Sequence, residues 1–232
     1  MTTNVIRVAV FVHGAGGGGW EWNAWTPIFE RAGWHCIAGD LQPNQQGIAQ
    51  TRFADYLAQV EHQAKEHKAD RLILIGASMG GILALKASEM LHPNALILVN
   101  SVGPAGIGNR KTKAHPKVVE WSKGTLTETQ DSMPDSDEAT IRFAFQHWRD
   151  ESGAVLDEIS KGIPVDPPKT PTLIVLGDKD TDVPNSVGKE MATRYGGEVR
   201  VYEGMSHVGP LLGKRAPEVA KDVLKWLDTN IR

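Results

Sequence analysis

A serine between two glycines, directly after an apolar run, constrains the fold of this chain more than any other feature. The segment Gly76-Ala77-Ser78-Met79-Gly80-Gly81 follows Arg71-Leu72-Ile73-Leu74-Ile75 and precedes Ile82-Leu83-Ala84-Leu85-Lys86-Ala87. A run of branched aliphatic residues is typical of a buried strand, whereas the later segment favours a helix. The pattern predicts a sharp strand-to-helix turn, the G-x-S-x-G nucleophile elbow, which lifts the hydroxyl of Ser78 above a sheet.

An elbow of this kind suits nucleophilic catalysis. The start of the helix aims backbone N–H groups and the positive end of its dipole at the reacting atom. Side chains at Gly76 and Gly80 would clash with neighbouring strands, which explains the two glycines. Because 24 of the 232 residues are glycine, an incidental turn is the alternative. The placement between a predicted strand and a predicted helix favours Ser78 as a nucleophile.

Length and composition indicate one α/β domain. At 232 residues the chain is long enough for one sizeable domain and short for two. A net charge of −3 does not indicate a nucleic-acid or anionic-membrane partner, and no apolar run approaches the length of a membrane span. The single cysteine, Cys36, permits no intrachain disulfide, and the first residues lack a signal-peptide pattern. We therefore expect a cytoplasmic protein.

Strand-like and helix-like segments alternate along most of the chain. The expected strands are 5–12, 34–38, 72–75, 95–99, 171–176 and 198–202, and the expected helices include 52–67, the elbow helix to about 92, 185–195 and one near the C-terminus. Strict alternation implies a mostly parallel six-stranded sheet with helices on both faces.

Residues 101–169 break this alternation. Asp135-Ser136-Asp137-Glu138 is typical of a capped helix start, and we expect Ile141, Phe145 and Trp148 on one face of that helix. An insertion at the carboxyl ends of the strands lies over the nucleophile. We therefore predict a helical lid at 101–169 over a core of 1–100 and 170–232, the alternative being a packing subdomain without substrate contact.

A serine hydroxyl becomes a good nucleophile only when a base accepts its proton. That base in turn needs an acidic residue to orient it and to stabilise its protonated form. His207 lies between two glycines in the loop after the last predicted strand, where it can reach the elbow. Three aspartates follow the fifth predicted strand: Asp178, Asp180 and Asp182. Asp180 is nearest the apex of that loop, so we predict it as the acid, with Asp178 as the alternative. The order Ser78, Asp180, His207 is the one expected of a nucleophile elbow.

Acyl transfer also needs donors for the developing oxyanion. We expect the backbone N–H of Met79 to be one donor and that of Ala15 to be the other. Ala15 belongs to a glycine-rich loop after the first strand, His13–Gly19, called the first loop below. Trp20 and Trp22 interrupt the junction with the next helix, so this loop does not match a dinucleotide fingerprint. Metal-ligand spacings are also lacking, and we expect no metal and no cofactor.

Four ordered motifs, HGAGGGGW, GASMGG, GDKDTDVP and GMSHVG, resemble those of α/β-hydrolase-fold serine hydrolases. The resemblance covers nearly all of the chain apart from the predicted lid. The segment from His13 to Leu41 is similar to the plant methyl-esterase and hydroxynitrile-lyase branch, although the lyases carry threonine where this chain has Gly14. The resemblance implies Ser78, Asp180 and His207 as the triad, with Ala15 and Met79 as oxyanion donors. Serine at the elbow differs from the aspartate of dehalogenases and epoxide hydrolases.

The expected activity is hydrolysis of a carboxylic ester of a small to medium apolar compound through an acyl-enzyme. One alternative uses the same triad on a carbon–carbon bond, thioester, amide or cyanohydrin, and another is a receptor that binds a small ligand without turnover. Each tryptophan among the candidate pocket residues can instead be simple core packing. The candidates for the substrate pocket are His13, Gly14, Trp20, Trp22, Trp121, Phe145 and Trp148.

Overall fold

A six-stranded sheet forms the centre of the computed structural model, which describes residues 5–108 and 114–231. All neighbouring strands are parallel, and their order is β2-β1-β3-β4-β7-β8. The predicted six-stranded parallel sheet is confirmed. The strands are β1 (Arg7–Val12), β2 (His35–Ile37), β3 (Arg71–Ala77), β4 (Ala95–Val99), β7 (Thr172–Gly177) and β8 (Glu198–Tyr202).

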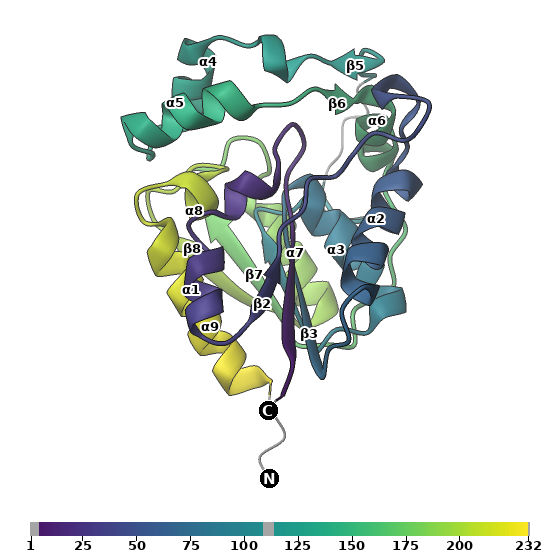
Figure 1. Cartoon of the computed structure of the whole chain (residues 1–232), viewed down its shortest axis with the longest axis vertical. Coiled ribbons are helices and arrows are strands. Elements are labelled where there is room, and N and C mark those ends of the chain that lie inside the picture. The colour runs from purple at the N-terminus through teal and green to yellow at the C-terminus, as the bar shows by residue number, and fades with distance from the viewer. Residues whose placement is uncertain (1–4, 109–113, 232) are drawn as a thin grey trace.

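Helices cover both faces of this sheet (Figure 1). One face packs against α1 (Thr26–Arg31), α8 (Gly209–Leu212) and α9 (Ala216–Asn230), and the other packs against α2 (Phe53–Lys65), α3 (Met79–Leu91) and α7 (Asn185–Tyr195). Short 3-10 turns, η1 (Gly19–Trp22) and η2 (Ile48–Gln50), lie in the connections. None of the helices within the described ranges is both long and apolar enough to span a bilayer.

The strands are apolar on both sides because both faces are buried. In β1, Ala9 and Phe11 belong to the core cluster under α1 and α9, whereas Val8 and Val10 belong to the cluster under α2 and α3. This two-residue alternation with apolar residues at every position is what a doubly covered parallel sheet requires.

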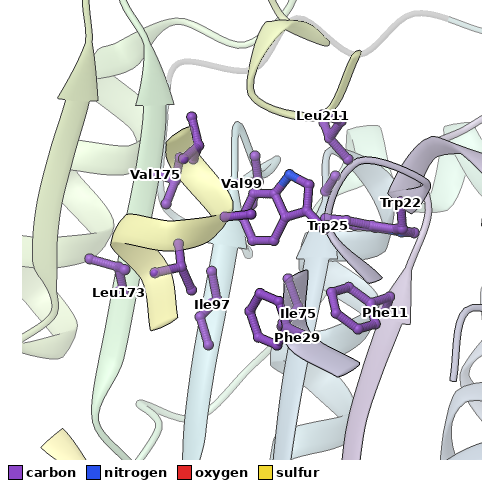
Figure 2. Packing of buried hydrophobic residues seen from close by; sticks show 14 of the residues in the cluster. Phe11, Trp22, Trp25, Phe29, Ile75, Ile97, Val99, Leu173, Val175 and Leu211 are labelled. Carbon is purple, nitrogen blue, oxygen red and sulfur yellow. The ribbon is translucent and has the colours of Figure 1, made fainter. Parts of the chain in front are cut away.

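Aromatic rings fill the core beneath the first loop (Figure 2). Phe11 lies 5.2 Å from Trp22 and 5.3 Å from Phe29 between ring centroids, and Trp22 lies 5.4 Å from Trp25. Burying each such side chain stabilises the fold by about 1.5–3 kcal/mol. Trp25, the N-cap residue of α1, also donates from Nε1 to the carbonyl oxygen of Pro210 over 2.9 Å, which attaches the start of α1 to α8.

The segment between β4 and β7 has two parts. Its elements are β5 (Val118–Val119), η3 (Trp121–Lys123), α4 (Leu126–Ser132), α5 (Glu138–His147), β6 (Glu151–Ser152) and α6 (Gly153–Lys161). In Figure 1, α4, α5 and the antiparallel β5–β6 pair extend across the top of the molecule, above the carboxyl ends of the sheet strands. Helix α6 instead packs beside α2, where Val155 and Ile159 join the core.

Helix α5 begins where the sequence predicts. The side chain of Asp137 accepts a hydrogen bond from the N–H of Thr140 over 2.7 Å, which caps the helix. The face turned towards the core consists of Ile141, Ala144 and the adjoining Trp148. Phe145, which we expected on that face, is 38% exposed. At about 100° per residue, position 145 lies at the edge of a stripe centred between 141 and 144.

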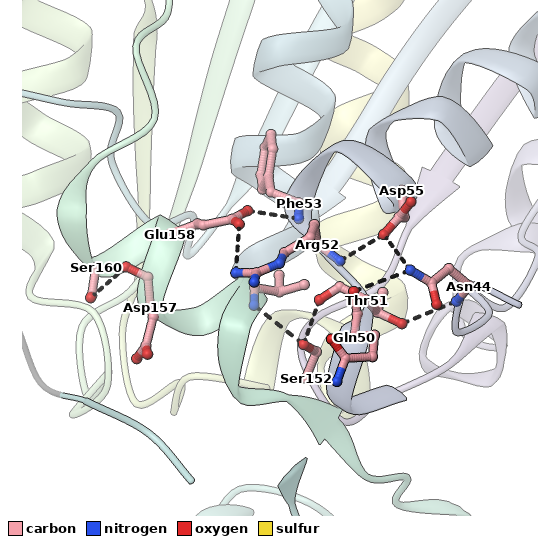
Figure 3. Close-up of polar contacts among 11 residues, drawn as sticks. Asn44, Gln50, Thr51, Arg52, Phe53, Asp55, Ser152, Asp157, Glu158 and Ser160 are labelled. Carbon is pink, nitrogen blue, oxygen red and sulfur yellow. Dashed lines mark hydrogen bonds and ion pairs between the residues drawn. The ribbon is translucent and has the colours of Figure 1, made fainter. Parts of the chain in front are cut away.

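Polar contacts attach α6 to the start of α2 (Figure 3). Ser152 Oγ donates to the carbonyl oxygen of Thr51 over 2.7 Å. The carboxylate of Glu158 accepts from the N–H of Phe53 over 2.9 Å and pairs with Arg52 over 3.3 Å. A carboxylate at a helix N-terminus is favourable because the first N–H groups have no helical acceptor. The insertion is therefore fixed to the core at its return.

Candidate active site

Ser78 stands at a strained turn between β3 and α3. Its φ of 51° and ψ of −117° lie in a region that residues with a side chain rarely occupy. A Cβ at Gly76 would lie 2.1 Å from the carbonyl oxygen of Gly80, and a Cβ at Gly80 would lie 2.1 Å from that of Val12. Both positions therefore admit only glycine, and the turn holds Ser78 at the carboxyl end of the sheet.

His207 and Asp180 form a buried pair. Asp180 Oδ2 lies 2.8 Å from His207 Nδ1, and the side chains are 0% and 13% exposed, respectively. Asp180 Oδ1 accepts the N–H groups of Asp182 and Val183 over 2.8 and 2.9 Å. Because both oxygens have hydrogen-bond partners, the Asp180 carboxylate is fixed in orientation.

The competing aspartate has a different role. Asp178 Oδ1 accepts the N–H of Gly204 over 2.6 Å, and its other oxygen lies 3.7 Å from Lys179 Nζ. Asp178 therefore fixes the turn that leads into the histidine loop and does not contact the ring of His207.

Asn100 joins the strand ends that carry these groups. The N–H of Ser78 donates to the carbonyl oxygen of Val99 over 3.0 Å. The next residue, Asn100, is 1% exposed, and its side chain accepts from the N–H of Gly177 over 2.9 Å and donates to the carbonyl oxygen of His207 over 2.7 Å. Within the described residues, Ser78 Oγ itself makes no hydrogen bond.

His13 is a structural part of the first loop. Its Nδ1 lies 2.7 Å from the carbonyl oxygen of Gly14, and its Nε2 accepts the N–H of Leu41 over 2.8 Å. This network assigns the proton to Nδ1. Burial lowers the pKa of His13 to about 4, although the Gly14 contact acts in the opposite direction. The neutral ring of His13 therefore stabilises the first loop through hydrogen bonds at both nitrogens.

The first loop leaves one N–H group free between two carboxylates. The N–H of Gly14 donates to Glu21 Oε2 over 3.0 Å, and that of Gly16 donates to Glu151 Oε2 over 3.2 Å. The N–H of Ala15, between them, has no acceptor in the part of the chain that the structure describes, and neither does that of Met79 at the start of α3. These are the two N–H groups that the sequence predicts as oxyanion donors.

Charges around His207 favour its protonated form. Burial alone lowers the pKa of His207, but the hydrogen bond and charge of Asp180 and the charges of Asp182 and Glu21 raise it above the ordinary 6.5. Burial also raises the pKa of Glu21 to about 7, against the Gly14 hydrogen bond and the positive charge of His207. Two buried ionisable groups with raised pKa values therefore lie near the first loop.

The predicted pocket residues occupy different environments. Trp20 lies 5.1 Å from Trp148 and 5.8 Å from Phe143 between ring centroids. The ring of Trp121 packs on the first loop, so that a Cβ at Gly16 would lie 2.3 Å from it. Trp22 is enclosed in the core at 0% exposure. The structure thus gathers Trp20, Trp121 and Trp148 around the first loop and α5, and leaves Trp22 inside the core.

Two surface cavities lie elsewhere. One of about 250 Å³ is lined by residues of η2, α6 and the chain before β5, and one of about 350 Å³ lies at the end of α3. Neither is lined by a triad residue or a predicted pocket residue. Across residues 5–108 and 114–231, no three histidine, cysteine or carboxylate side chains are grouped to hold a metal ion.

The sequence analysis missed three residues of this site: Glu21, Asn100 and Glu151. Glu21 carries a local signal, since an acidic residue between Trp20 and Trp22 in a segment that packs on the core must find a donor. Asn100 directly follows a buried strand, where an amide side chain often substitutes for backbone partners. Glu151 carries no local signal, because its contact with Gly16 joins residues 135 positions apart.

Comparison with known families agrees with the topology. A family model described as "Alpha/beta hydrolase family" matches residues 9–222, a range that includes Ser78, Asp180 and His207. The chain belongs to the α/β-hydrolase family. The membership predicted from the four motifs is confirmed. A search of the curated proteins found no match to this α/β hydrolase.

Solved structures with the same fold include plant enzymes. This α/β hydrolase is similar to the Arabidopsis methylesterase MES16 (17% identity, TM-score 0.74, covering 97% of this chain and 100% of that chain). It is also similar to tomato methylketone synthase I complexed with 2-tridecanone (17% identity, TM-score 0.78, covering 98% of this chain and 100% of that chain). A third similar structure is a pyrethroid hydrolase from Sphingobium faniae JZ-2 (19% identity, TM-score 0.75, covering 96% of this chain and 98% of that chain). At these identities the likeness shows the fold.

Proposed function

We propose that this α/β hydrolase is a serine esterase that cleaves a carboxylic ester of a small to medium apolar compound through an acyl-enzyme. The observation that carries the proposal is the buried His207–Asp180 pair at 2.8 Å, on the same edge of the sheet as the strained elbow of Ser78. A histidine with its Nδ1 proton held by a carboxylate has Nε2 available as a base.

The proposed reaction has two halves, acylation of Ser78 and hydrolysis of the acyl-enzyme, and the same residues act in both. Ser78 Oγ attacks the ester carbonyl while its proton passes to His207 Nε2, and the oxyanion receives the N–H groups of Ala15 and Met79. The imidazolium then gives its proton to the leaving alcohol, which leaves an acyl-Ser78. In the second half, water attacks the acyl group while its proton passes to His207 Nε2. The imidazolium then returns the proton to Ser78 Oγ as the carboxylic acid is released. We infer that Ser78 Oγ and His207 Nε2 come within hydrogen-bond distance when substrate binds, since catalytic hydrogen bonds often form fully only in the complex.

Substrate size and polarity are inferred from the aromatic residues near the first loop. Trp20, Trp121 and Trp148 lie on or against the segment that spans the carboxyl edge of the sheet. We infer that β5, α4, α5 and β6 act as the lid and that these rings contact an apolar acyl or alcohol group. The names of the structural neighbours, a methylesterase and a pyrethroid hydrolase, are consistent with esters of this kind.

The test is turnover of a matched ester series. We expect the wild-type protein to hydrolyse p-nitrophenyl acetate, butyrate and octanoate, and the Ser78→Ala variant to lose this activity while unfolding at the same urea concentration. Because a methylketone synthase shares the fold, the panel also includes a β-keto acid, a thioester, an anilide and a cyanohydrin. If the protein turns over only one of these compounds, the bond in that compound, and not a carboxylic ester, is the one that this protein cleaves. Tight binding without any turnover would identify a receptor.

A further inference from the structure

We propose that Glu21 is a positioning residue of this site: its buried carboxylate holds the first loop so that the Ala15 N–H faces Ser78, and it places a negative charge near His207. The inference rests on the proposed function, because it assigns Glu21 a role in the oxyanion site and in the base of that reaction.

The first loop is folded around the carboxylate of Glu21. Glu21 is 4% exposed, and its Oε2 accepts the N–H of Gly14 over 3.0 Å. A Cβ at Gly17 would lie 1.9 Å from Oε1, so the chain passes the carboxylate twice at close range. A Cβ at Gly14 would lie 3.4 Å from Ser78 Cβ and 3.7 Å from Glu21 Oε2. Gly14 therefore lies close to both the carboxylate and the nucleophile.

A second carboxylate completes the geometry on the other side of Ala15. Glu151 of β6 accepts the N–H of Gly16 over 3.2 Å and the hydroxyl of Tyr56 over 2.8 Å. With both neighbouring N–H groups bound to carboxylates, the peptide of Ala15 has little freedom to turn. Hydrogen bonds that fix the donor before substrate arrives are the usual basis of oxyanion stabilisation.

The charge of Glu21 acts on His207 from a different element than Asp180. Asp180 contacts the ring from the loop after β7. The charges of Asp182, in the same loop, and of Glu21, in η1, also raise the pKa of the ring. The pKa of Glu21 in turn responds to the Gly14 hydrogen bond and to the charges of His207 and Asp40. Burial raises the pKa of Glu21 to about 7, so Glu21 carries its negative charge above that pH. The charge of each group therefore affects the pKa of the other.

Three variants separate the two roles. Glu21→Gln keeps an acceptor for the N–H of Gly14 but removes the charge, whereas Glu21→Ala removes both. Glu151→Gln is the matched control, because Glu151 also holds the first loop but is not among the groups that act on His207. Two readouts are used: the pKa of the His207 ring by long-range ¹H–¹⁵N NMR, and the rate constant for labelling of Ser78 by a fluorophosphonate at pH 9.

We expect Glu21→Gln to lower the pKa of His207 by about 0.5–1 unit and to keep most of the labelling rate. Glu151→Gln should leave that pKa within error of the wild type. Glu21→Ala should label at least about tenfold more slowly than Glu21→Gln, because the loop loses its acceptor. If Glu21→Ala fails to fold, the titration of Glu21→Gln decides alone.

An unchanged His207 pKa in Glu21→Gln, or equal labelling of Glu21→Ala and Glu21→Gln, overturns the inference. Failure of the proposed function looks different. In that case the wild-type protein is not labelled at Ser78, whereas failure of this inference leaves a wild-type protein that labels and variants that match it.

Discussion

The side-chain amide of Asn100 donates to the carbonyl oxygen of His207 over 2.7 Å. The same side chain accepts from the N–H of Gly177, three residues before Asp180, over 2.9 Å. Asn100 follows β4, the strand beside β3 and its elbow. One buried residue at the sheet edge thus links the loops that carry the proposed acid and base.

Replacing Asn100 with alanine should therefore affect both stability and reactivity. The change leaves the N–H of Gly177 and the carbonyl oxygen of His207 without their partner, and we expect the free energy of unfolding to fall by about 2–3 kcal/mol. Labelling of Ser78 by a fluorophosphonate should also slow. Asn94→Ala is the control, since Asn94 binds the N–H of Leu72 at the opposite end of the sheet. Equal labelling of the two variants would contradict a positioning role for Asn100.

Asp180→Asn and Asp178→Asn distinguish the two candidate acids. Asp180 contacts the ring of His207, so its amide variant should lower kcat for a chromogenic ester by about 10³–10⁴-fold. Asp178 binds only the turn at Gly204, so its variant should keep kcat within about tenfold of the wild type. Steady-state kinetics at pH 8 give the comparison. A larger loss in Asp178→Asn than in Asp180→Asn would reverse the assignment.

The pH profile should show one acid limb with its midpoint above 6.5. In the proposed reaction the neutral ring of His207 is the active form. Its pKa is raised, because the hydrogen bond and negative charges around it outweigh burial. Activity is therefore full above that pKa and is lost as the pH falls through it. Asp182→Asn removes one of those charges and should move the midpoint of kcat/KM to lower pH. A profile that stays flat to pH 5 would exclude His207 as the base.

Gly80→Ala should damage the elbow. The added Cβ would lie 2.1 Å from the backbone carbonyl of Val12, so the start of α3 must shift, and we expect a loss of about 1–3 kcal/mol in the free energy of unfolding together with loss of labelling at Ser78. Gly196→Asn is the control. Its φ of 73° suits asparagine and nothing lies within 4 Å of a Cβ there. Urea unfolding and labelling are measured on both, and an active Gly80→Ala would contradict the close packing.

Local patterns predict the fold of this chain well. The sequence predicts β4, α7 and β8 with the bounds that the structure has, and β1, β3 and β7 within a few residues. Strands β1, β3, β4 and β7 are apolar runs bounded by proline or polar residues, so the pattern and the tertiary structure agree. Strands β5 and β6 are not predicted, because each has two residues and depends on its partner for its conformation.

The site is predictable where a motif or chain order determines it. Ser78, His207 and Asp180 follow from three loops with a known order, and the structure brings His207 and Asp180 into contact. The residues that hold them are less predictable. Asn100 and Glu151 act through contacts between distant segments, and no local pattern encodes which backbone groups a buried side chain will meet.

The most direct test of the account is the position of a covalent adduct. Wild-type protein is treated with a fluorophosphonate, digested and analysed by mass spectrometry. We predict a single adduct on the peptide that contains Ser78, absent in Ser78→Ala and formed much more slowly in His207→Ala. An adduct on another residue, or a folded wild-type protein that does not react, would contradict the assignment of Ser78 as an activated nucleophile.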